Sequence, residues 1–233
     1  MALPPKTNEA FLREVDDELR RDQLVGFWTR YGKLAIGLGV ALLIALAGFF
    51  YWQHHEEQTA GVAGEQLQSA YDALSDGKKD VASSTLAPLA ASGRPGYATL
   101  ARFTQADLLL QNKNEKGAAA MFAAIADDSA AAKPFRDLAL VRQTSAEYDT
   151  LKPQAVIDRL RPLAVPGNPW FGSAGEMVAV AYLRSGRRDL AGRMFGQIAR
   201  DANVPQSIRQ RSVQMAGVLG VDAVAQSEDV KAQ

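Results

Sequence analysis

The residues best suited to metal or acid–base chemistry are two adjacent histidines, His54 and His55, followed directly by Glu56 and Glu57. Imidazole and carboxylate groups ligate metal ions and exchange protons near neutral pH. Adjacent residues on a helix point to different faces, however, so the histidine pair is a poor chelate for one ion. We therefore expect no metal site here and interpret both histidines as plain interfacial residues.

Acidic pairs are the other candidates, because two converging carboxylates can act as general acid and base. Asp16-Asp17 and Asp127-Asp128 are more simply explained as solvated residues. The chain has no cysteine and no histidine after His55, which excludes a thiolate metal site, a cysteine nucleophile and a histidine-based site beyond that point. It also lacks phosphate-binding and nucleophile-elbow motifs. We predict no enzymatic activity, no cofactor and no small-molecule substrate. The alternative is a carboxylate-only enzyme, which needs a deep pocket with two converging acids.

The composition is that of an ordinary globular protein. The chain has 233 residues, of which 47% are hydrophobic and 22% charged, and its formal net charge is zero. A neutral chain lacks the basic surface that nucleic-acid binding requires, so no nucleic-acid partner is expected.

An uncharged apolar run extends from Leu34 to Trp52. As a helix it spans about 28 Å, close to the hydrocarbon thickness of a bilayer. Aromatic residues suited to the headgroup level stand at both ends. The run is too long and too far from Met1 for a cleaved signal peptide. We predict one transmembrane helix over 34–52, with the lipid bilayer as a binding partner.

Positive charge is distributed unevenly about this run and predicts its orientation. Four basic residues lie just before it, and none follows it until Lys78. Lysine and arginine near a span favour the cytoplasmic side. The prediction is a single-pass protein with residues 1–33 in the cytoplasm and the remainder outside it. The preceding residues are Arg20, Arg21, Arg30 and Lys33.

Two smaller features lie in this N-terminal third. Gly37, Ala41 and Ala45 are four residues apart, so they form a small-residue face on which another membrane helix can pack; the alternative is ordinary membrane-helix composition. In the tail 1–33, apolar residues recur at helical spacing and predict a short amphipathic helix. This helix could lie on the membrane or dock on a partner; the alternative is that it only leads into the span. These residues are Phe11, Leu12, Val15 and Leu19.

From residue 53 to 221 the pattern is helical throughout, with no alternating run of strand length. Gly, Pro and Asn separate Ala-rich amphipathic segments, so short antiparallel helices are expected. The fold class is therefore all-α, and the polar stretch 222–233 is predicted to be disordered. The expected helices cover 58–75, 79–91, 97–111, 115–128, 134–149, 153–163, 170–185, 188–201 and 206–219.

Near the C-terminus, four residues fit the small–aromatic–small–aromatic pattern of a tetratricopeptide repeat of about 34 residues. Small residues suit the contact between the two helices of a pair, and large ones fill the space between pairs. The pattern predicts a tetratricopeptide-like stack, with an irregular helical bundle as the alternative. The four residues are Ala179, Tyr182, Ala191 and Phe195.

The same spacing recurs upstream, so these positions are predicted to define the packing of two further repeats. A copy expected near 140–165 misses the frame and is interpreted as a degenerate repeat. The clear upstream copy is Ala106, Leu109, Ala118 and Phe122, and the fainter one is Ala70, Ala73, Ala82 and Leu86.

Three residues are candidates for partner binding. Trp170 follows Pro169 at a helix start, where it is either an exposed hot spot or a buried anchor. Arg184 and Arg188 belong to an arginine-rich stretch, which is either a basic patch for an acidic partner or a scattered solvated face.

The stretch from Glu14 to Lys33, running directly into the apolar segment, resembles the ancillary Sec translocon subunit family, in its alphaproteobacterial form. The segments 101–110, 118–125, 169–170 and 205–211 are also similar to it. The resemblance implies a bacterial inner-membrane protein with a periplasmic tetratricopeptide-like domain. It implies association with the SecYEG translocon and with a membrane-anchored periplasmic chaperone of the prolyl-isomerase type.

The expected function is thus a non-enzymatic, membrane-anchored interaction module at the protein-export channel. The competing hypothesis is a tetratricopeptide-like scaffold of another cell-envelope assembly, such as the division or cell-wall machinery.

Overall fold

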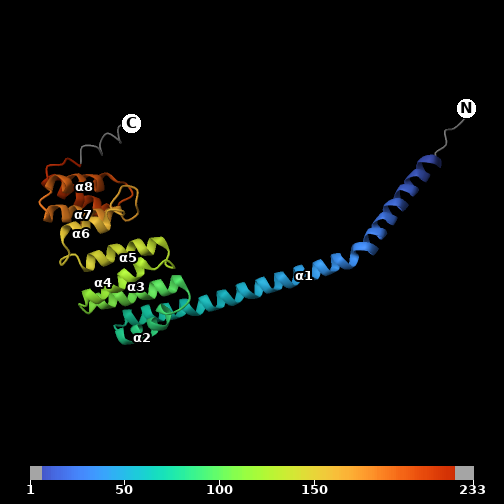
Figure 1. Ribbon diagram of the computed structural model, residues 1–233, viewed down its shortest axis with the longest axis horizontal. Helices are drawn as coiled ribbons and strands as arrows, with labels where there is room; N and C mark the ends of the chain where they lie inside the picture. The colour runs from blue at the N-terminus through green and yellow to red at the C-terminus, as the bar shows by residue number, and fades with distance from the viewer. Residues whose placement is uncertain (1–6, 224–233) are drawn as a thin grey trace, which may run out of the picture. The chain divides into compact units, whose positions relative to one another are not determined.

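A computed structural model describes the backbone of residues 7–223 and the side chains of 29–34 and 36–223. The described residues form nine helices and no strand (Figure 1), which confirms the predicted all-α class. The side chains of Phe11, Leu12, Val15 and Leu19 and the stretch 224–233 lie outside the described residues. The helices are α1 (Thr7–Ser75), α2 (Lys79–Ala90), α3 (Pro95–Gln111), α4 (Glu115–Asp127), α5 (Lys133–Ala146), α6 (Pro153–Leu160), α7 (Phe171–Arg184), α8 (Arg188–Arg200) and α9 (Gln206–Val218).

Helix α1 contradicts the prediction of a helix that begins near residue 58. It continues without a break from Thr7 to Ser75. The joining segment contains no proline, and side-chain hydrogen bonds one turn apart support it, from Gln53 to Glu57 at 3.2 Å and between Gln58 and His54 at 3.0 Å. The apolar run and the first repeat helix are therefore one element.

The chain divides into two compact units, residues 1–62 and 63–233. The division lies beyond the predicted boundary at 52/53. In the first unit, large apolar side chains from Leu34 to Trp52 are exposed; Leu34 and Leu43 are each 66% exposed and Trp52 is 64% exposed. Within the described residues, α1 is the one helix long and apolar enough to cross a membrane.

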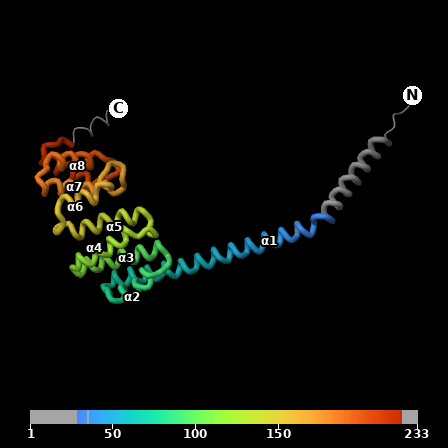
Figure 2. Tube along the Cα trace, viewed as in Figure 1, coloured from blue at the N-terminus to red at the C-terminus, as the bar shows by residue number. Residues whose placement is uncertain are grey.

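The second unit is a stack of antiparallel helix pairs (Figure 2). The C-terminal part of α1 packs with α2 and α3 around Leu67, Leu86 and Ala101. Successive cores then join α3, α4 and α5, then α5, α6 and α7, and finally α7, α8 and α9. The helices α3, α5, α7 and α9 also contact one another in that order, so the first helices of successive pairs lie side by side.

A shared turn shows which pairs are equivalent. After α1, α3 and α7, the backbone enters the left-handed region, at Gly77, Lys113 and Gly186. The next residue then donates its N–H to a carbonyl five residues back, at Ala73, Leu109 and Tyr182, over 2.8–2.9 Å. These acceptors occupy the same position in the repeat pattern, so the backbone repeats together with the sequence.

The pair α5–α6 is the irregular repeat expected near 140–165. Its second helix has only eight residues. No residue between the two helices has a positive φ. The turn instead uses hydrogen bonds between residues three positions apart, from the Tyr148 N–H to the Ser145 carbonyl and from the Thr150 N–H to the Glu147 carbonyl. This longer turn shifts α6 along the chain, which explains why the repeat frame misses it.

A short segment after α9, residues 219–223, packs on two glycines of α8. A Cβ at Gly192 would lie 2.9 Å from Val221 Cγ2 and 3.2 Å from Leu219 Cβ, and one at Gly196 would lie 3.0 Å from Val221 Cγ1. Ala223 is buried in the same cluster. The glycines therefore allow the close approach that closes this end of the stack.

Gly192→Ala is expected to displace this segment and to lower the free energy of unfolding by about 1–3 kcal/mol, because overpacking forces nearby groups apart. Urea unfolding of the full chain in detergent measures the change. Gly217→Ala is the matched control: nothing lies within 4 Å of its Cβ position, so it should be neutral or slightly stabilising. Equal stability of Gly192→Ala and the wild type would contradict the packing described here.

Candidate interaction surface

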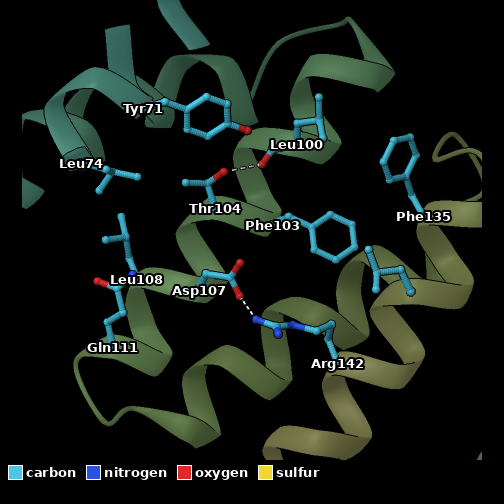
Figure 3. A pocket seen from close by; sticks show the side chains of 11 residues that line it. Tyr71, Leu74, Leu100, Phe103, Thr104, Asp107, Leu108, Gln111, Phe135 and Arg142 are labelled. Atoms are coloured by element: carbon cyan, nitrogen blue, oxygen red, sulfur yellow. Dashed lines mark hydrogen bonds and ion pairs between the residues drawn. The ribbon is translucent and has the colours of Figure 1, made fainter. Parts of the chain in front are cut away.

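A groove of about 490 Å³ lies along the first helices of the first three pairs, α1, α3 and α5 (Figure 3). Its lining is mostly apolar and aromatic, with Thr104, Asp107, Gln111 and Arg142 as the polar members. We call it the first groove. The remaining lining residues are Tyr71, Leu74, Leu100, Phe103, Leu108, Phe135 and Leu138.

Two kinds of contact hold the floor of the first groove. The Phe103 ring lies 5.8 Å from the ring of Phe122 and 6.3 Å from that of Phe135, which joins α3 to α4 and α5. Across this apolar floor the Arg142 guanidinium pairs with Asp107 and also lies 5.4 Å from the centre of the Phe122 ring. The single basic and single acidic group of the groove thus compensate each other.

A second groove, of about 400 Å³, lies between α5 and α7 and is open to solvent. The Tyr148 hydroxyl donates to the Met177 carbonyl at 3.0 Å, and burial raises the pKa of that phenol. Glu176 accepts two hydrogen bonds from Arg211 of α9, at 3.0 and 2.9 Å. The lining residues of this second groove are Ser145, Tyr148, Asp149, Glu176, Met177 and Val180.

One stripe of α5 and the turn after it connects the two grooves. Its residues are three and four positions apart, which places them on one helical face. The first three line the first groove and the last two line the second. The stripe is Phe135, Leu138, Arg142, Ser145 and Asp149. A smaller hollow of about 310 Å³ lies elsewhere, among α2, α3 and α4.

The residues of the two clear repeat copies lie in two buried clusters. Ala106, Ala118 and Phe122 are fully buried in one cluster, with Leu109 half-buried beside them. In the other cluster, Ala179 and Ala191 are fully buried and Phe195 is 1% exposed, while Tyr182 is half-buried against them. Sequence periodicity thus points to the core, and the grooves above it were not predicted.

None of the three predicted partner-binding residues lines the first or the second groove. Trp170 is half-buried against the core that joins α5, α6 and α7. Arg184 donates to the carbonyls of Tyr148 at 2.8 Å and Leu151 at 3.3 Å, and its guanidinium lies 5.2 Å from the centre of the Tyr148 ring. Arg188 is exposed. Arg184 therefore holds the α5–α6 turn against α7.

Arg184→Ala is expected to lower the free energy of unfolding by about 1–2 kcal/mol, because two carbonyls and a cation–π contact lose their partner. Arg188→Ala, an exposed neighbour of the same type, should stay within about 0.5 kcal/mol of the wild type. Urea unfolding of both variants measures these changes. Equal losses of unfolding free energy in the two variants would refute a structural role for Arg184.

The acidic and histidine candidates do not converge on one site in the described part of the chain. Asp128 accepts hydrogen bonds from Arg102 at 2.8 Å and from the Ala130 N–H at 2.9 Å, and the Arg102 bond is the main reason for its lowered pKa. It fastens the α4–α5 turn to α3. His54 bonds to Gln58, and His55 stacks on Tyr51 at 6.5 Å. The face of Gly37, Ala41 and Ala45 is exposed.

Paired helices stacked through a recurring turn define a helical repeat protein. The chain belongs to the family described as the tetratricopeptide repeat-like domain, which matches residues 26–215. The match takes in the apolar segment as well as most of the stack. Comparison with curated proteins and with solved structures gave no match. Domains of this family are typically non-catalytic scaffolds for protein–protein interaction.

Proposed function

We propose that this protein is a membrane-anchored scaffold whose first and second grooves bind segments of partner proteins. The observation that carries the proposal is the direct continuity of α1 from an uncovered apolar stretch into the repeat core. Apolar side chains that stay exposed along a helical stretch of this length need lipid or protein to remove them from water, and residues 34–52 have the length of a bilayer span.

In this proposal residues 1–33 lie in the cytoplasm of a bacterium and the repeats lie in the periplasm, with α1 crossing the inner membrane once. The asymmetry of lysine and arginine about the span supports this orientation. Gly37, Ala41 and Ala45 then form a face on which a membrane helix of a partner packs closely. The anchor raises the local concentration of the grooves at the membrane surface.

The proposed partners are the SecYEG translocon and a membrane-anchored periplasmic chaperone. Support comes from the resemblance of residues 14–33 to the ancillary translocon subunits, combined with a repeat fold suited to protein partners. Trp170 and Arg188 remain proposed contributors to partner binding.

Chemical crosslinking in native membranes, followed by mass spectrometry, tests the partners. We expect adducts with translocon subunits and with a periplasmic chaperone. Recovery of division or cell-wall proteins without translocon subunits would instead support a scaffold of that machinery. A reporter enzyme fused after Gln233 tests the orientation: it should be active only as a periplasmic reporter, and cytoplasmic activity would overturn the topology.

A further inference from the structure

We propose that one extended partner segment occupies both grooves and carries an apolar side chain and a lysine or arginine about five residues apart. The apolar side chain enters the first groove and the basic one lies over the second. This inference rests on the proposed function and specifies the class of segment that the same surface takes.

The charges of the second groove favour a cation. Asp149 is exposed and has no ion-pair partner among the described residues. Two arginines that bond to lining residues of this groove are both engaged: Arg211 holds Glu176 with two hydrogen bonds, and Arg184 donates to the carbonyls of Tyr148 and Leu151. An uncompensated carboxylate therefore faces solvent at this groove.

The other walls of the second groove suit the stem of a long basic side chain. Met177 and Val180 supply apolar surface beside the acidic groups. Lysine and arginine cover such surface with their methylene groups while the charged end stays near water. The apolar wall of the second groove can contact the methylene stem, while the carboxylate at its rim can pair with the charged end.

The first groove favours an uncharged, apolar side chain. Asp107 and Arg142 satisfy each other, so neither offers a free charge to a ligand. Around them, Tyr71 remains 39% exposed, and Leu138 and Phe135 are half-buried. An aromatic or aliphatic side chain placed there would cover apolar surface that the stack leaves open.

The spacing of the two side chains follows from the α5 stripe. Leu138 of the first groove and Asp149 of the second are eleven positions apart, which is about 16.5 Å at the rise of a helix. An extended chain advances about 3.3 Å per residue. About five residues of an extended segment therefore span the distance from Leu138 to Asp149.

Selection from a random twelve-residue peptide library on the purified full chain in detergent tests the inference. The recovered peptides should share an aromatic or aliphatic residue with Lys or Arg four to six positions away. Their affinity, measured by fluorescence anisotropy, should fall at least about tenfold for Asp149→Lys, because a repulsive pair replaces an attractive one. The loss should be below about twofold for Asp189→Lys, an exposed charge reversal on α8.

A second measurement leaves the protein unchanged: replacing the basic residue of a recovered peptide by Gln should weaken its binding to the wild type about tenfold. Peptides that require Tyr71 for binding but carry no basic residue would overturn the proposed role of the second groove. They would still agree with the proposed scaffold function. An empty selection, or peptides indifferent to both Tyr71→Ala and Asp149→Lys, would overturn the inference, whereas the membrane orientation is decided separately by the reporter fusion.

Discussion

Phe122→Ala is expected to lower the free energy of unfolding by about 3–5 kcal/mol, the range for removing a fully buried aromatic ring. Phe122 is 0% exposed, and its ring contacts that of Phe103 and lies under the guanidinium of Arg142. Its loss would open a cavity where α3, α4 and α5 meet, directly beneath the first groove. Urea unfolding of the full chain in detergent, followed by circular dichroism, measures the change.

Tyr71→Ala is the matched control for this experiment. Tyr71 is also an aromatic residue of the first half of the stack, but it lies on the groove surface and is 39% exposed. Its removal should cost less than about 1 kcal/mol while weakening peptide binding. If Phe122→Ala unfolded at the same urea concentration as the wild type, the assigned core would be wrong.

Replacing both Leu42 and Leu43 by arginine is expected to prevent stable membrane insertion. The two residues lie in the middle of the apolar run, where each arginine disfavours insertion by about 2.5–3.5 kcal/mol. Most of the protein should then leave the membrane fraction on washing with alkaline carbonate, whereas the wild type should stay in the pellet.

Val81→Arg is the control, because it also replaces an exposed apolar residue by arginine but lies in α2, outside the apolar run 34–52. Val81 is 52% exposed. This substitution should leave the protein in the pellet. Release of the wild type by carbonate, or retention of the double variant, would show that α1 does not anchor the chain.

The sequence specifies the stack well because its turns and cores are local. Gly77 and Gly186 mark turns that need a left-handed backbone, and the small and aromatic positions of each pair follow directly. Lys113 adopts the same conformation without glycine, so that turn is recognised only from the residues around it. The helices from α2 to α9 accordingly lie within a few residues of their predicted bounds.

Two features could not be read from periodicity. Continuity of α1 depends on whether a mostly polar stretch such as 53–62 stays helical, and local propensity favours this only weakly. The grooves depend on which half-buried side chains of separate helices face each other. The α5 stripe carried a usable signal in its three- and four-residue spacing, but its partners Tyr71, Asp107 and Glu176 come from other helices and needed the tertiary structure.

A photo-crosslinking amino acid placed at Tyr71 tests the central claim, that the face of the first helices binds protein partners at the membrane. Illumination of native membranes should give defined protein adducts at Tyr71 and few or none when the same amino acid replaces Val81 of α2. Absence of adducts at Tyr71, or equal adducts at both positions, would contradict this account.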